Sequence, residues 1–144
     1  MVQQVDMKWF KKKKNISFKE AIDLTGFPII TFESKEKKFN FLLDTGSNCS
    51  VLNNDCTKEI DGVYTGKTTS LCGLDGIDRE VKFFKANMRY GDKELIEEFQ
   101  ITDLSAPFDS IKKEFGVTLH GILGNSFFTK YQSLIDFNNL KFQI

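Results

Sequence analysis

The residues best suited to chemistry lie in a short acidic loop at 44–47. Asp44, Thr45, Gly46 and Ser47 follow directly after an apolar stretch. Gly46 permits a tight turn whose backbone N–H can bond the Asp44 carboxylate. Thr45 and Ser47 add hydroxyl groups that can fix the orientation of that carboxylate. A rigid, hydrogen-bonded acid on a loop is what general acid–base chemistry requires.

A catalytic role for Asp44 would need a second carboxylate. Two carboxyl groups that lie close together share a proton, because two like charges cannot both ionise cheaply. One of them can then act as a base toward water while the other acts as an acid toward a peptide carbonyl. The chain has one such loop, so the partner would be Asp44 of a second copy. The alternative is that Asp44 is a structural turn residue.

The elements around this loop are expected to be mostly β-strands. Apolar patterning predicts strands over 27–33, 39–43, 49–52, 65–71, 81–88 and 95–101, with polar or Gly-containing turns between them. Residues 53–62 read as a polar connection. Two final strands, 133–137 and 140–144, flank Asn138-Asn139, which is typical of a two-residue hairpin turn.

Two short helices are predicted after the central strands. Ser105 is the expected N-cap of the first, with Pro107 in its first turn and Gly116 at its end. The second spans 126–130. The pattern therefore favours a mostly β domain with two short helices.

Residues 1–26 are expected to form an N-terminal appendage to a domain that spans 27–144. Residues 11–14 are all Lys, which favours a solvated, partly disordered tail. A docking arm for a membrane surface or a partner is the alternative. Ser17 and Glu20 then form the pattern of a capping box that opens a short helix ending at Gly26.

Composition gives no support for several classes of partner. The net charge is zero, which gives no indication of nucleic-acid binding, and no stretch has the about 18 apolar residues of a membrane span.

The cysteines, Cys49, Cys56 and Cys72, are odd in number and irregularly spaced, which favours free thiols in a cytoplasmic protein. A Cys49–Cys56 bridge is the alternative. With His120 as the one histidine, we expect no metal or cofactor.

The acidic loop and a later segment together resemble the pepsin and retropepsin clan of aspartic proteases. Residues 41–47 are similar to the active-site signature of that clan, and 120–128 to its apolar-apolar-Gly motif, which opens a short helix. Residues 131–144 resemble its terminal β-hairpin. The resemblance covers 27–144 and implies a retropepsin-like acid protease fold, in which one chain forms one lobe and is active as a homodimer.

The resemblance assigns roles to the loop residues. Asp44 matches the catalytic aspartate, and Thr45 the residue whose hydroxyl locks the two active-site loops across the dimer. Gly46 matches the loop glycine, and Ser47 the hydroxyl beside the carboxylate.

The resemblance also implies a substrate-binding set. Ile122 falls at a wall of the substrate pocket, although it can equally be plain core. The remaining residues match the flap that closes over substrate, or else form an ordinary hairpin turn: Gly73, Leu74, Asp75, Gly76 and Ile77.

The chain departs from the family pattern at three places. One Asp-Thr-Gly is present, so two copies must pair. Asn125 and Ser126 replace the Arg and the Asn or Asp that retropepsins commonly carry after the glycine. The flap has no tyrosine of the pepsin kind, because Tyr64 lies too early.

The function implied is an aspartic endopeptidase. Two Asp44 carboxylates at a two-fold axis would activate the water that hydrolyses a peptide or protein substrate held in extended form. The alternative is a non-catalytic module of the same fold, used for dimerisation or peptide binding, because a fold does not guarantee activity. A further hypothesis is that the enzyme trims its own basic arm near Lys14.

Overall fold

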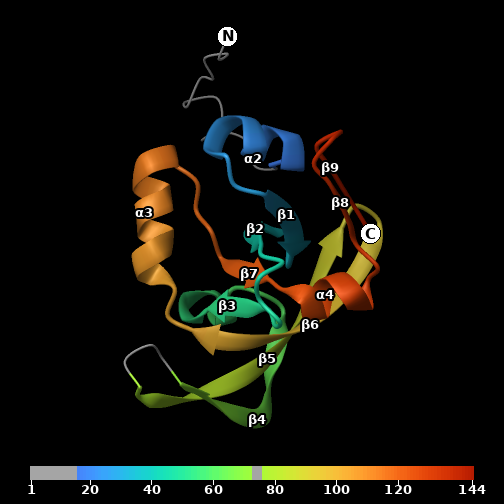
Figure 1. Ribbon diagram of the computed structural model, residues 1–144. Coiled ribbons are helices and arrows are strands. Elements are labelled where there is room, and N and C mark those ends of the chain that lie inside the picture. Colours follow the sequence, from blue (N-terminus) through green and yellow to red (C-terminus); the bar gives the residue numbers. More distant parts are fainter. Residues whose placement is uncertain (1–15, 73–75) are drawn as a thin grey trace.

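Six strands close into a barrel, and a seventh strand extends it (Figure 1). The computed structural model describes residues 16–72 and 76–144. Around the barrel the order is β1 (Ile29–Ser34), β2 (Lys37–Leu43), β7 (Gly121–Leu123), β3 (Val51–Asn53), β6 (Lys93–Thr102) and β5 (Asp78–Tyr90). The ring closes where β5 pairs with β1, and β4 (Gly62–Cys72) pairs with β5 outside it. The mostly β fold expected from the sequence is confirmed.

The short strand β7 is central to the barrel because it joins two strands of opposite direction. It runs parallel to β2, with Leu43 opposite Leu123, and antiparallel to β3, with Leu52 opposite Gly121. Parallel neighbours end at the same edge of a sheet. The residues that follow β2 and β7 are therefore brought together, although about 80 residues of chain separate them.

Phenylalanine rings fill the barrel. Phe32 and Phe41 lie with ring centroids 5.5 Å apart, Phe41 and Phe99 stack at 5.6 Å, and Phe32 and Phe127 lie at 5.7 Å. These four side chains have no more than 1% of their surface exposed. Burying aromatic side chains of this size is a main source of the stability of the barrel.

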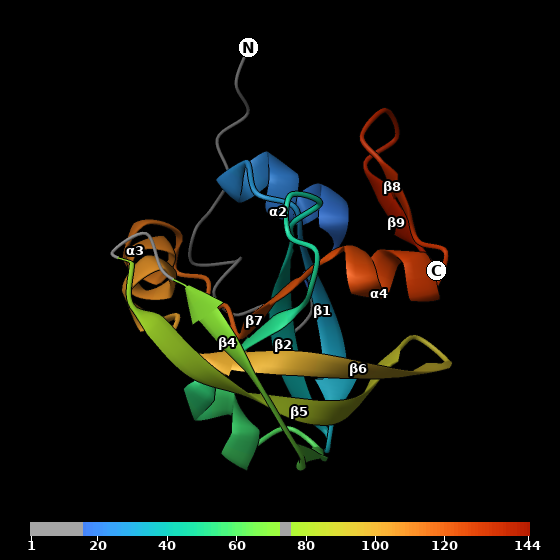
Figure 2. The same ribbon diagram turned by 60° about the horizontal axis from the view of Figure 1, so that its bottom comes forward.

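Two helices flank opposite sides of the barrel, as Figures 1 and 2 both show. They are α3 (Ser105–Phe115) and α4 (Asn125–Lys130). The expectation that Ser105 is the N-cap of α3 is wrong by one residue. Leu104 occupies that position, and the Asp103 carboxylate accepts the backbone N–H of Ser105 at 3.0 Å. Gly116 ends the helix in the left-handed conformation, as predicted.

The terminal hairpin has a longer turn than expected. Strands β8 (Leu134–Asp136) and β9 (Lys141–Gln143) are joined by four residues, so the two-residue turn predicted at Asn138-Asn139 is wrong. Asp136 explains the difference, because its carboxylate accepts the backbone N–H groups of Asn138 and Asn139 at 2.9 and 3.0 Å. Asp136 is thus a turn residue.

The connection after β3 also differs from its sequence-based description. Residues 54–58 form the short 3-10 helix η1 (Asn54–Lys58). Within and after it, Cys56 and Ile60 are buried in the main core. A segment that reads as polar is therefore anchored by two apolar side chains.

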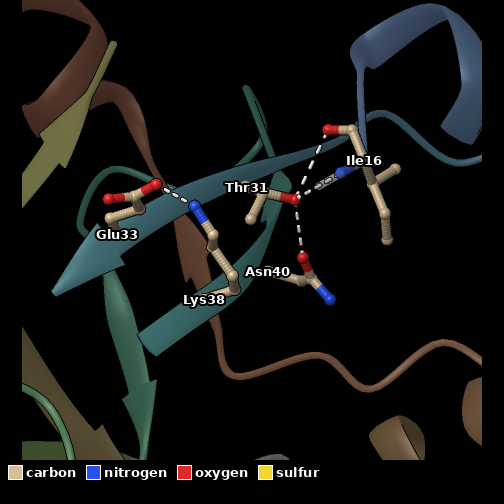
Figure 3. Close-up of polar contacts among 5 residues, drawn as sticks. All are labelled: Ile16, Thr31, Glu33, Lys38 and Asn40. Carbon is tan, nitrogen blue, oxygen red and sulfur yellow. Dashed lines mark hydrogen bonds and ion pairs between the residues drawn. The ribbon is translucent and has the colours of Figure 1, made fainter. Parts of the chain in front are cut away.

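Helix α2 (Phe18–Thr25) has the capping box and the glycine C-cap that the sequence predicts. It packs on the barrel, with 3% of Phe18 and none of Ala21 exposed. Just before it, the backbone N–H of Ile16 donates to the Thr31 hydroxyl on β1 at 2.9 Å, and that hydroxyl donates to Asn40 on β2 at 2.7 Å (Figure 3). The domain boundary expected at 26/27 therefore does not coincide with a break in packing. Residues 1–15, including the lysine run, lie outside the described residues.

The hairpin of β1 and β2 is closed by a charge pair on its exposed face. Glu33 lies directly opposite Lys38 in the register, and their side chains form an ion pair (Figure 3). Such exposed pairs contribute little to stability, about 0–1 kcal/mol. The hairpin is held mainly by its buried face.

Among the described residues, no helix is long and apolar enough to cross a bilayer.

The capping box gives a test of whether α2 belongs to the cooperative fold. Ser17→Ala removes the side-chain acceptor of the Glu20 N–H, so the free energy of unfolding should fall by about 1 kcal/mol in urea melts of the whole chain. Ser110→Ala, an exposed serine within α3, is the control and should change it by less than about 0.5 kcal/mol. Identical melts for wild type and Ser17→Ala would show that α2 unfolds separately.

Candidate active site

The Asp44 loop begins where β2 ends. The backbone N–H of Asp44 donates to the carbonyl of Leu123 at 2.9 Å, which extends the β2–β7 pairing by one residue. The N–H of Gly46 donates to Oδ1 of Asp44 at 2.9 Å, as the sequence indicates. Asp44 is half-buried. Its carboxylate is therefore held by its own loop at the edge of the barrel, next to solvent.

Residues after β7 hold the other side of the loop. The backbone N–H of Asn125 donates to the Ser47 carbonyl at 2.8 Å, and that of Ser126 donates to the Asn48 carbonyl at 3.1 Å. The side-chain amide of Asn125 donates to the Thr45 carbonyl at 2.9 Å. The two segments that the sequence analysis singled out are thus joined directly. Asn125 thus has a defined role in this contact.

Gly124 allows this approach because it has no side chain. A Cβ atom there would lie 2.3 Å from the carbonyl oxygen of Cys49 and 2.8 Å from that of Ser47. Real Cβ atoms do not come so close to backbone oxygen. The glycine of the apolar-apolar-Gly motif is therefore required by the loop that packs on it.

The hydroxyl group of Ser47 lies differently from the expectation. Ser47 donates its hydroxyl to the carbonyl of Cys49 at 2.7 Å, so it stabilises the loop rather than orienting the Asp44 carboxylate. Thr45 is exposed. Its side chain is accessible to another molecule.

The predicted substrate-binding residues are placed in part. Ile122 on β7 is half-buried and packs on the apolar cluster that contains Ile29 and Leu119. It therefore contributes to the core, whether or not it also contacts substrate. At the tip of the β4–β5 hairpin, Gly76 has a φ of +76° and Ile77 is 56% exposed. The other three tip residues lie outside the described residues: Gly73, Leu74 and Asp75.

A buried acid below the loop was missed by the sequence analysis. Glu97 on β6 is 4% exposed, and its Oε2 accepts the hydroxyl groups of Ser50 at 2.7 Å and Ser126 at 3.2 Å. Burial raises the pKa of Glu97, against the opposing effect of these hydrogen bonds and of the Lys130 charge. The signal was present, because Glu97 occupies an inward position of an alternating strand, between Leu95 and Phe99.

His120 and Cys56 have structural roles. Nδ1 of His120 accepts the backbone N–H of Asn40 at 2.9 Å, and burial lowers the pKa of the imidazole. Cys49 and Cys56 are free thiols, so the bridge considered between them does not form. Burial raises the pKa of Cys56 to about 12, which makes it a poor nucleophile. No cluster of three His, Cys, Asp or Glu side chains able to hold a metal occurs within 16–72 and 76–144.

No protein-family model matches this chain, and no curated protein matches its sequence.

The close approach at Gly124 predicts the effect of adding one methyl group. Gly124→Ala should lower the free energy of unfolding by about 3 kcal/mol, because the methyl group overlaps fixed backbone atoms. Gly91→Ala is the control: its φ is +63° but a Cβ there meets nothing within 4 Å, so backbone strain alone should cost about 1 kcal/mol. Equal losses in urea melts would contradict the steric account.

Glu97 predicts a pH dependence of stability. Because burial raises its pKa, native Glu97 holds a proton more tightly than the unfolded chain does. The wild type should therefore gain stability relative to Glu97→Gln as the pH falls through the raised pKa, and the gain should be complete below the ordinary value of 4.5. Urea melts of both proteins across this range measure the difference. A difference that stays constant with pH would contradict the prediction.

Proposed function

We propose that the chain is an aspartic endopeptidase that acts as a homodimer. The observation that supports this most is the Asp44 loop: a half-buried carboxylate at the end of a core strand, bonded by the Gly46 N–H and braced by the segment after β7. This bracing fixes the backbone of the loop. It restricts the carboxylate to one position, which acid–base chemistry needs.

The proposed reaction needs two such carboxylates. With one proton shared between two Asp44 side chains, the ionised one takes a proton from water as the water oxygen bonds to the peptide carbonyl carbon. The protonated one gives its proton to the carbonyl oxygen. As the resulting diol collapses, one of its hydroxyl groups gives a proton to the ionised carboxylate, the C–N bond breaks, and the other carboxyl group gives its proton to the departing nitrogen. The shared proton is restored by the end of the cycle.

The exposed side of the loop fits pairing with a second copy. Thr45, Gly46 and Asn48 are exposed, so another loop could approach here without displacing a core residue. One chain supplies one Asp44, and a symmetric two-fold contact would place its counterpart opposite. The long β4–β5 hairpin, which lies below the rest of the barrel in Figure 1, would cover an extended substrate.

The substrate would be a peptide with apolar side chains near the cleaved bond. Ile122 lies one residue before Leu123, whose carbonyl holds the Asp44 N–H, so an apolar wall would stand beside the reacting groups. Backbone hydrogen bonds to an extended chain would give affinity, and side-chain pockets would give preference.

Cleavage of a peptide library by the wild type and Asp44→Asn tests the proposal. Asp44→Asn should lower the turnover number by about a thousandfold or more, because an amide cannot share the proton. Asp92→Asn, in the exposed β5–β6 turn, is the matched control and should keep wild-type activity. Activity per chain should rise with protein concentration until the dimer is saturated.

Two outcomes would contradict the proposal. Equal cleavage by wild type and Asp44→Asn would exclude Asp44 as the reacting group. A chain that remains monomeric in sedimentation at high concentration, and cleaves nothing, would favour a peptide-binding module of the same fold.

A further inference from the structure

Glu97 is an acidic residue on the buried face of a strand whose other buried residues are apolar. On β6 it lies between the inward-facing Leu95 and Phe99, and its register partner on β5 is Ala86, which is fully buried. A buried carboxyl group is costly unless hydrogen-bond donors surround it. The hydrogen-bond donors that offset this cost include two serine hydroxyl groups beside the Asp44 loop.

The contacts of Glu97 form a directed chain of hydrogen bonds. The Gly124 N–H donates to the Ser50 hydroxyl oxygen at 3.1 Å, and Ser50 donates its own proton to Oε2 of Glu97 at 2.7 Å. Ser126 donates to the same oxygen at 3.2 Å, and the backbone N–H of Glu98 donates to Oε1 at 3.2 Å. Since a hydroxyl has one proton, Ser50 can serve Gly124 and Glu97 together only in this direction.

This chain joins both ends of the Asp44 loop. Ser50 is fully buried where the loop enters β3, and its carbonyl accepts the Gln100 N–H of β6 at 3.0 Å. Gly124 follows Leu123, whose carbonyl holds the backbone of Asp44. Ser126 uses its backbone N–H to hold the Asn48 carbonyl. Glu97 therefore reaches the loop by two short paths: through Ser50, which directly follows Cys49, and through Ser126, which holds the Asn48 carbonyl.

We propose that Glu97 is a positioning residue for Asp44. The carboxyl group of Glu97 accepts the hydroxyl groups of Ser50, at the end of the acidic loop, and of Ser126, at the start of α4, and so ties these two segments together. The inference rests on the proposed proteolytic function. Glu97 does not bond the Asp44 carboxylate in this structure. It sets the place of the backbone from which that carboxylate projects.

The surroundings of Glu97 show what a neutral replacement would change. The positive charge of Lys130 on α4 opposes the rise in the pKa of Glu97 that burial causes. The Lys130 ammonium donates to the Ile96 carbonyl at 2.7 Å. In Glu97→Gln the carbonyl oxygen can still accept both serine hydroxyls. The amide N–H₂ would then face the Glu98 N–H, donor against donor. The variant therefore keeps the shape of the side chain and loses one acceptor and the charge.

The experiment compares Glu97→Gln with Glu98→Gln, the exposed neighbour on the same strand, in full-length protein. Peptide cleavage gives kcat and KM, and circular dichroism gives the folded fraction for correction. Glu97→Gln should lower kcat by about tenfold to a hundredfold with KM nearly unchanged, because a displaced carboxylate harms the reaction more than binding. Glu98→Gln should match the wild type. Hydrogen exchange of the Gly124 amide should be faster in Glu97→Gln alone.

Hydrogen exchange of the Gly124 amide separates the proposed proteolytic function from the proposed positioning role of Glu97. If the wild type cleaves nothing but Glu97→Gln speeds Gly124 exchange, the proteolytic function fails while the bracing by Glu97 stands. An unchanged kcat, or unchanged Gly124 exchange, would overturn the positioning role. If Glu97→Gln does not fold, Ser126→Ala replaces it: losing one hydroxyl donor should lower kcat by about threefold, and wild-type kcat would overturn the inference.

Discussion

The structure depends on one close contact, the approach of the Gly124 backbone to the backbone of the acidic loop. Because no side chain intervenes there, carbonyl and N–H groups of residues far apart in sequence come within hydrogen-bonding distance. The parallel pairing of β2 with β7 brings the two segments to the same edge, and the missing Cβ lets them touch. Without that contact, the barrel would still hold Asp44 at its edge, but the carboxylate would lie on an unsupported loop.

Much of the fold could be predicted from sequence because the strands alternate in polarity. The central strands, the capping box of α2 and the glycine end of α3 all follow from local patterns of a few residues. The order of the strands in the barrel could not be obtained this way. The pairings of β7 with β2 and β3 join segments about 70 to 80 residues apart, and no local pattern encodes such contacts.

The geometry of the acidic loop could be predicted to a similar extent. Asp44 and the Gly46 contact follow from a motif, since both lie within three residues of each other. The roles of Ser47 and Glu97 depend on what surrounds them in space. A serine beside a carboxylate has several acceptors to choose from, and here the Cys49 carbonyl is the one in reach. The inward position of Glu97 indicated burial, but its serine partners come from β3 and α4.

The bracing of the loop lies within one chain, and this affects how activity would arise. Asn125 already holds the Thr45 carbonyl, and Gly46 already holds the Asp44 carboxylate, before any second copy arrives. Association would then spend little free energy on ordering the reacting groups, because each half is preorganised. Under the proposed dimeric reaction, a weak and reversible contact between copies would suffice, so hydrolysis would rise with the local concentration of chains and fall on dilution.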